Sequence, residues 1–119
     1  MGSKILVLGL TFKEDCPDIR NSQIPNIVME LRSYGCEVLV HDPLCNPLEA
    51  KEEYGIHLTL QENIPLVSAI VITVAHKIYK DWNTEEWLKL LLPQGVVIDI
   101  KNVVPAKYIE ESGYRVWKL

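Results

Sequence analysis

Ile5-Leu6-Val7-Leu8 is the first of four short apolar runs in this sequence of 119 residues. The other three lie at 38–40, 69–74 and 96–98. The runs are continuous rather than alternating with polar residues, so they predict strands covered on both faces, as in a parallel sheet. Weaker strands are expected at 56–58 and 114–117, which makes about six strands in all.

Helical patterns lie between the apolar runs. Residues 24–31 carry apolar side chains at the i, i+3, i+4, i+7 spacing, after a candidate N-cap at Ser22 and before Gly35. Further helices are expected from Pro47 to before Gly55, over 84–91, and from Pro105 to before Gly113. Strand and helix alternate, which predicts a single α/β domain with a Rossmann-like, doubly wound parallel sheet in three layers and the strand order 3-2-1-4-5-6.

The composition, 48% hydrophobic and 24% charged, is that of an ordinary globular domain. A net charge of -4 disfavours broad attraction to nucleic acid, so we expect no nucleic-acid partner. No apolar run approaches the roughly 20 residues that cross a bilayer, and no secretion signal is visible, which predicts a cytoplasmic protein without a membrane partner.

None of the three cysteines lies in a C-x-x-C pair, so we expect no metal. Trp82 and Trp87 are more typical of packing anchors than of a base-stacking platform.

The loop after the first run, residues 9–22, is long and contains only one glycine, Gly9. A dinucleotide-binding turn needs G-x-G-x-x-G for close approach to the pyrophosphate and for helix packing, so NAD is not expected to bind here in the usual way. Asp42 stands where such a fold places its ribose-binding acid. Without the glycines, we interpret Asp42 as a residue that ends a strand and turns the chain.

Positive side chains follow several strands at one predicted edge of the sheet. Lys13 and Arg20 lie in the first loop, His76 and Lys77 follow the third run, and Lys101 follows the fourth. Lysine binds phosphate as a point charge and arginine as a two-pronged donor. The pattern therefore predicts a phosphorylated small molecule as the ligand.

Each cation also has a plainer interpretation. Lys13 can be a solvated loop lysine, and Arg20 can pair with Asp15 or Asp18 to stiffen the loop. His76 can be an ordinary histidine at the end of a strand. These alternatives stay open on the pattern alone.

A resemblance to a known family favours the ligand-binding interpretation of these residues. The loop reads Phe12-Lys13-Glu14-Asp15-Cys16-Pro17-Asp18-Ile19-Arg20-Asn21-Ser22 and resembles the opening of the UDP-binding domain in the UDP-glucose/GDP-mannose dehydrogenase family. The order of residues in this loop is similar to that in the branch of the family that oxidises UDP-N-acetylglucosamine or UDP-N-acetylgalactosamine. Three shorter stretches resemble the same family: Val40-His41-Asp42-Pro43, Val74-Ala75-His76 and Asp99-Ile100-Lys101-Asn102.

The resemblance implies that residues 1–119 are the C-terminal, UDP-sugar-binding domain of an NAD-dependent dehydrogenase. Such an enzyme oxidises the C6 hydroxyl of a UDP-N-acetylhexosamine to the uronic acid for cell-surface polysaccharide biosynthesis. In that family, NAD and the catalytic cysteine belong to an N-terminal domain, and a central helix supports a homodimer. The N-terminal domain and the central helix are expected to be absent here. No cysteine stands in a G-G-x-C motif, so the isolated domain should be inactive. Met1-Gly2-Ser3 is interpreted as an expression start.

Carried over residue by residue, the resemblance implies that Phe12 and Lys13 contact the nucleotide sugar, with Arg20 as a further cation of the same loop. Lys101 takes the place of a cation that reaches sugar or phosphate and is often arginine in relatives that use UDP-glucose. His76 is expected to line the pocket near the uridine.

Two other classes of protein remain to be distinguished. A receiver-type signalling domain needs acids at the end of the first strand and an aspartate after the third, and both are missing. A free-standing nucleotide-binding Rossmann-like module with a regulatory or assembly role would lack G-x-G-x-x-G and G-G-x-C motifs upstream in its natural reading frame.

Overall fold

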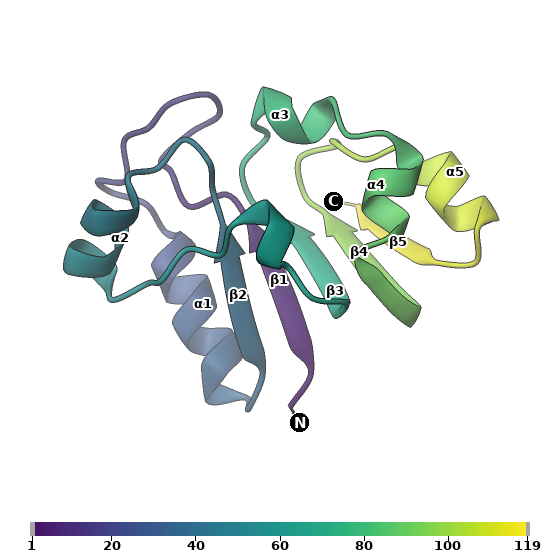
Figure 1. Cartoon of the computed structure of the whole chain (residues 1–119), viewed down its shortest axis with the longest axis horizontal. Helices are drawn as coiled ribbons and strands as arrows, with labels where there is room; N and C mark the ends of the chain where they lie inside the picture. Colours follow the sequence, from purple (N-terminus) through teal and green to yellow (C-terminus); the bar gives the residue numbers. More distant parts are fainter. Residues whose placement is uncertain (1, 119) are drawn as a thin grey trace.

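The computed structural model describes residues 2–118 (Figure 1). Its elements follow the chain in the order β1 (Lys4–Leu8), α1 (Ile24–Ser33), β2 (Glu37–His41), α2 (Pro47–Tyr54), η1 (Gln61–Asn63), β3 (Val67–Ile72), α3 (Lys77–Lys80), α4 (Thr84–Leu88), β4 (Leu91–Asp99), α5 (Ala106–Glu111) and β5 (Arg115–Lys118). The strands form one parallel sheet in the order β2-β1-β3-β4-β5. The α/β fold and the change of winding direction at β1 are therefore confirmed.

The strand expected at 56–58 is reduced to a single bridge. Leu58 pairs in parallel with Val40 of β2, and the Thr59 N–H donates to the Val40 carbonyl at 2.7 Å. The segment lies on the outer side of β2, where the predicted order placed it, but the chain turns into η1 after this contact. The sheet thus has five strands among the described residues rather than about six.

The helices begin close to their predicted signals. The Asn46 side chain caps α2 by accepting the N–H groups of Leu48 at 2.9 Å and Glu49 at 3.2 Å. Ser22 lies one residue before the N-cap of α1, yet its hydroxyl still accepts the Ile24 N–H at 3.2 Å. The four-residue helix α3 was not predicted from the sequence, because so short a segment carries no periodic apolar pattern.

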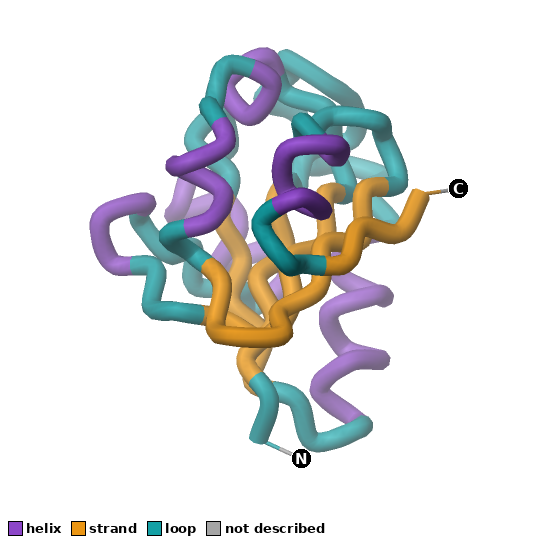
Figure 2. The backbone as a smooth tube through the Cα atoms, turned by 90° about the vertical axis from the view of Figure 1, so that its right-hand side faces the viewer, coloured by secondary structure: helices purple, strands orange, loops and turns teal. Residues whose placement is uncertain are grey.

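Alternate residues of β1 face opposite sides of the sheet and enter different cores. Leu6 and Leu8 join a buried cluster that includes side chains from α4 and α5, whereas Val7 joins a cluster that includes side chains from α1 and α2. Figure 2 shows the strands lying between helices on both sides. This arrangement confirms the three layers.

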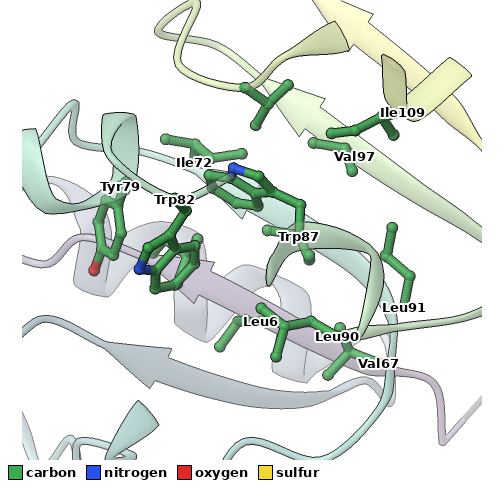
Figure 3. Close-up of a cluster of buried hydrophobic side chains, with 13 residues drawn as sticks. Leu6, Val67, Ile72, Tyr79, Trp82, Trp87, Leu90, Leu91, Val97 and Ile109 are labelled. Atoms are coloured by element: carbon green, nitrogen blue, oxygen red, sulfur yellow. The ribbon is translucent and has the colours of Figure 1, made fainter. Parts of the chain in front are cut away.

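A chain of aromatic rings runs through the first of these cores. Trp82 and Trp87 meet edge to face with their ring centroids 4.8 Å apart, and Tyr79 lies 5.2 Å from Trp82 (Figure 3). His76 continues the chain, 5.7 Å from Tyr79. Both tryptophans are buried, which confirms them as packing anchors.

Candidate functional site

The loop between β1 and α1 leaves the sheet at the edge where all the strands have their carboxyl ends (Figure 1). Gly9 begins it with φ at +111°. A Cβ at this position would lie 2.5 Å from the Val74 Cβ and 2.8 Å from the Val74 backbone nitrogen, so the two chain segments cross too closely for any side chain. The Thr73 hydroxyl lies within donating distance of the Leu8 and Gly9 carbonyls, at 2.9 and 2.7 Å. The close crossing with the chain after β3 is therefore enough to require glycine here.

Asp42, directly after β2, anchors the start of the loop from below. Its Oδ2 accepts the N–H groups of Leu10 at 2.7 Å and Thr11 at 3.1 Å, and its Oδ1 accepts the Leu44 N–H at 3.0 Å. Burial by itself would raise the pKa of this carboxyl, but the hydrogen bonds from His76 and Leu10 outweigh burial and hold the pKa below its ordinary value. The turn expected at Asp42 is present, and the same side chain also fixes the first loop.

His76 lies beneath the loop rather than on a ligand-facing surface. Its side chain is fully buried and its Nε2 lies 3.0 Å from Asp42 Oδ2. Its Nδ1 accepts the Asp15 N–H at 2.9 Å. A backbone N–H can only donate, so Nδ1 is the acceptor and Nε2 carries the proton that points to Asp42. The structure thus differs from the expectation that His76 lines the pocket, because both ring nitrogens are engaged inside the domain.

His41 and Tyr79 form a second buried pair beside the first. The Tyr79 hydroxyl lies 2.9 Å from His41 Nδ1 and donates to the His41 carbonyl at 2.9 Å. Burial lowers the pKa of His41, and the neighbouring Asp42 carboxylate offsets only part of this effect. Burial, followed by the Asp42 charge, raises the pKa of Tyr79.

We expect the protein to lose stability as the pH falls below the ordinary histidine pKa of 6.5. In that range the unfolded chain binds a proton at His41 that the folded chain does not, so the free energy of unfolding must decrease with acidification. Denaturant titrations from pH 8 to pH 5 measure this. His41→Gln should flatten the decline over that range, and a variant profile parallel to that of the wild type would contradict the assignment to His41.

The tip of the loop is exposed. Phe12 is 57% exposed, and Lys13 and Glu14 are exposed beside it. The backbone of this tip is nevertheless held, because the Phe12 N–H donates to the Asp18 carbonyl at 2.7 Å and the Thr11 hydroxyl donates to the Lys13 carbonyl at 3.0 Å. Two of the expected ligand-binding side chains therefore stand together on an ordered support.

Arg20 is also exposed, but it has a partner. Its Nε and one terminal nitrogen donate to the two Asp18 oxygens at 3.0 Å each. This hydrogen-bonded pair raises the pKa of Arg20 and lowers the pKa of Asp18. Both residues line an open depression of about 400 Å³ together with Glu49. Arg20 thus pairs with Asp18, one of the two partners expected from the sequence, while Asp15 instead accepts the Lys77 N–H at 2.8 Å.

Lys101 follows β4 at the same edge of the sheet and is exposed. The turn that carries it is fixed by Asp99, whose carboxylate accepts the N–H groups of Val103 and Val104 at distances of 2.8 to 2.9 Å. The structure thus brings Lys13, Arg20 and Lys101 to one edge, on loops after β1 and β4.

The residues of this chain do not fit a dinucleotide cofactor. The loop after β1 has no second or third glycine, and the Asp42 oxygens are committed to N–H donors and His76 rather than open to a ribose. Within residues 2–118, no group of three histidine, cysteine or acidic side chains is placed to hold a metal ion. No helix in that range has the length and apolar character needed to cross a membrane.

The pairing of Asp42 with His76 was not predicted from the sequence. A topological signal exists, because β2 and β3 flank β1 in the sheet. Polar residues that follow these two strands must lie on either side of the loop after β1. Composition and spacing alone do not reveal which of them are buried.

Known proteins resemble this Rossmann-like domain both in sequence and in structure. A sequence model described as "UDP-glucose/GDP-mannose dehydrogenase family, UDP binding domain" matches residues 6–106. The chain is 39% identical over 106 residues to a UDP-N-acetyl-D-glucosamine 6-dehydrogenase of Salmonella typhi, which covers 89% of this chain and 25% of that protein. It is 36% identical over 118 residues to Protein CapL of Staphylococcus aureus, which covers 99% of this chain and 27% of that protein.

A solved structure, the NDP-N-acetyl-D-galactosaminuronic acid dehydrogenase from Methanosarcina mazei Go1, matches with a TM-score of 0.82 at 25% identity. The match covers 98% of this chain and 24% of that one. The chain belongs to the UDP-glucose/GDP-mannose dehydrogenase family and corresponds to its UDP-binding domain. It spans about a quarter of the length of these relatives.

Proposed function

We propose that this chain is the UDP-sugar-binding domain of an NAD-dependent nucleotide-sugar 6-dehydrogenase. The full enzyme would oxidise the C6 hydroxyl of UDP-N-acetylglucosamine or UDP-N-acetylgalactosamine to the uronic acid, in the cytoplasm, for cell-surface polysaccharide biosynthesis. The observation that carries the proposal is the loop segment 12–20, which lies within the matched range 6–106 and holds Phe12, Lys13 and Arg20 exposed on an anchored backbone.

The proposed ligand-binding residues have complementary chemistry. Lys13 would supply a point charge to the diphosphate, and Lys101 would approach sugar or phosphate from the loop after β4. Phe12 offers an exposed aromatic face beside the lysine. Arg20 would bind either through its remaining donors or by exchanging Asp18 for the diphosphate, because the pair is open to solvent.

This domain would contribute orientation rather than chemistry. Binding of the UDP group, which does not react, can hold the sugar C6 in place against catalytic groups on another domain, and such use of remote binding raises the rate. Closure of two domains over the ligand would exclude water. NAD, which the residues here do not fit, would be held by an N-terminal domain of the full protein, and we propose that the full protein is a homodimer.

We expect the 119-residue domain to bind UDP weakly and Lys13→Ala to abolish that binding. The variant removes a charge that faces solvent, so the fold should persist while affinity falls by at least about tenfold. Isothermal titration calorimetry with UDP and with UDP-N-acetylglucosamine measures this.

Lys89→Ala is the matched control. Lys89 is exposed like Lys13, but it precedes β4 at the opposite edge of the sheet. Equal affinities of wild type and Lys13→Ala would remove Lys13 from the site. Equal losses in both lysine variants would show that only the overall charge matters.

A further inference from the structure

We propose that His76 is a positioning residue that, together with Asp42, ties the two ends of segment 10–15 to the sheet edge and so presents Phe12 and Lys13 to the ligand. The inference rests on the proposed function for the identity of that ligand. It gives His76 an indirect role in place of the expected contact with the uridine.

The first end of the segment is held by Asp42. One carboxylate oxygen accepts the N–H groups of both Leu10 and Thr11, at 2.7 and 3.1 Å. The same oxygen lies 3.0 Å from His76 Nε2. Because all three donors converge on one buried atom, the direction in which the chain leaves β1 is fixed.

The second end is held at Asp15, from two directions. The Asp15 N–H donates to His76 Nδ1 at 2.9 Å, and the Asp15 carboxylate accepts the Lys77 N–H at 2.8 Å. Asp15 has a φ of +57°, in the left-handed region that residues with a side chain adopt uncommonly and Asp tolerates better than most, and these bonds help to hold it there.

Phe12, Lys13 and Glu14 lie between these two anchors and are exposed. A loop ordered before the ligand arrives loses less conformational entropy on binding than a mobile one. Fixing both ends of a six-residue segment therefore favours binding without any contact between His76 and the ligand.

Histidine suits this place because its ring has an acceptor and a donor on opposite sides. Nδ1 must accept from Asp15 while Nε2 donates to Asp42. The Thr11 hydroxyl, 3.3 Å from Nε2, donates to the Lys13 carbonyl and so can accept a share of the same proton. Glutamine carries its carboxamide on a longer and more flexible chain, so it does not hold a donor and an acceptor at the two ring positions as the rigid imidazole does.

The test compares wild type with His76→Gln, His76→Phe and Asp15→Gly. Asp15→Gly relieves the positive φ and removes the bond to the Lys77 N–H without changing any buried side chain, so it serves if the His76 variants do not fold. Amide hydrogen exchange at Leu10, Thr11 and Asp15 reports the order of the loop, and calorimetry with UDP reports affinity. Long-range nitrogen-proton spectra of wild type should show His76 protonated at Nε2 only.

We expect exchange at Asp15 to accelerate in every variant, and UDP affinity to fall by roughly 10- to 100-fold in the His76 variants, as happens when a group that orients a metal ligand is removed. Asp15→Gly should show a smaller loss. Unchanged exchange in the folded variants, a His76 ring protonated at Nδ1, or undiminished UDP binding by a loosened loop would each overturn the inference alone. A wild-type domain that does not bind UDP would overturn the proposed function as well.

Discussion

Replacing Gly9 with alanine is expected to lower the free energy of unfolding by about 2–6 kcal/mol, from two separate effects. The new methyl group would lie 2.5 Å from the Val74 Cβ and 2.8 Å from the Val74 nitrogen, which forces strands β1 and β3 to shift at their carboxyl ends. The φ of +111° adds backbone strain that any side chain would suffer. Chemical denaturation followed by far-ultraviolet circular dichroism measures the loss.

Gly113→Ala separates the two effects. Gly113 also has a positive φ, +97°, but a Cβ there would meet nothing within 4 Å. This variant should therefore show only the strain, about 1–3 kcal/mol. Equal losses at both positions would mean that the close crossing at Val74 does not constrain the loop.

Asp42→Ala is the second change with a large expected effect, a loss of about 3–5 kcal/mol. Removing the carboxylate leaves buried donors at His76 Nε2 and at the Leu10 and Thr11 N–H groups without their acceptor. The variant should either unfold at room temperature or fold with a disordered first loop. Denaturant titration and amide exchange at Leu10 distinguish these two results.

Asp81→Ala is the control for Asp42→Ala. Asp81 pairs with Lys77 at 2.9 Å, but both side chains are mostly exposed, at 62% and 76%. Exposed pairs contribute little because water competes for both charges, so stability should hardly change. If Asp42→Ala proved as mild, the buried cluster would not be what fixes the loop.

The sheet was predictable because its information is local. Continuous apolar runs mark strands covered on both faces, and right-handed crossovers then fix their order. The same reasoning placed 56–58 beside β2, although only Leu58 forms a bridge. Periodicity cannot tell how many residues of a short segment will pair before the chain turns away.

The candidate site was predictable in part. The exposed positions of Phe12, Lys13 and Lys101 agree with a site at the carboxyl edge of the sheet. The pairing of Arg20 with Asp18 was one of two alternatives that sequence could not separate. The burial of His76 could not be foreseen, because it depends on contacts with Asp42 and Asp15, which lie 34 and 61 residues away along the chain.

The aromatic rings that lead from His76 into the core provide a natural optical probe. Of the three tryptophans, Trp82 and Trp87 are buried in this chain of rings, and Trp117 is 60% exposed. The red-shifted emission that added iodide quenches would therefore come from Trp117. The blue-shifted emission that is shielded from iodide would come from Trp82 and Trp87. The unlabelled protein thus reports, through its intrinsic fluorescence, how tightly the core around Tyr79, Trp82 and Trp87 is packed.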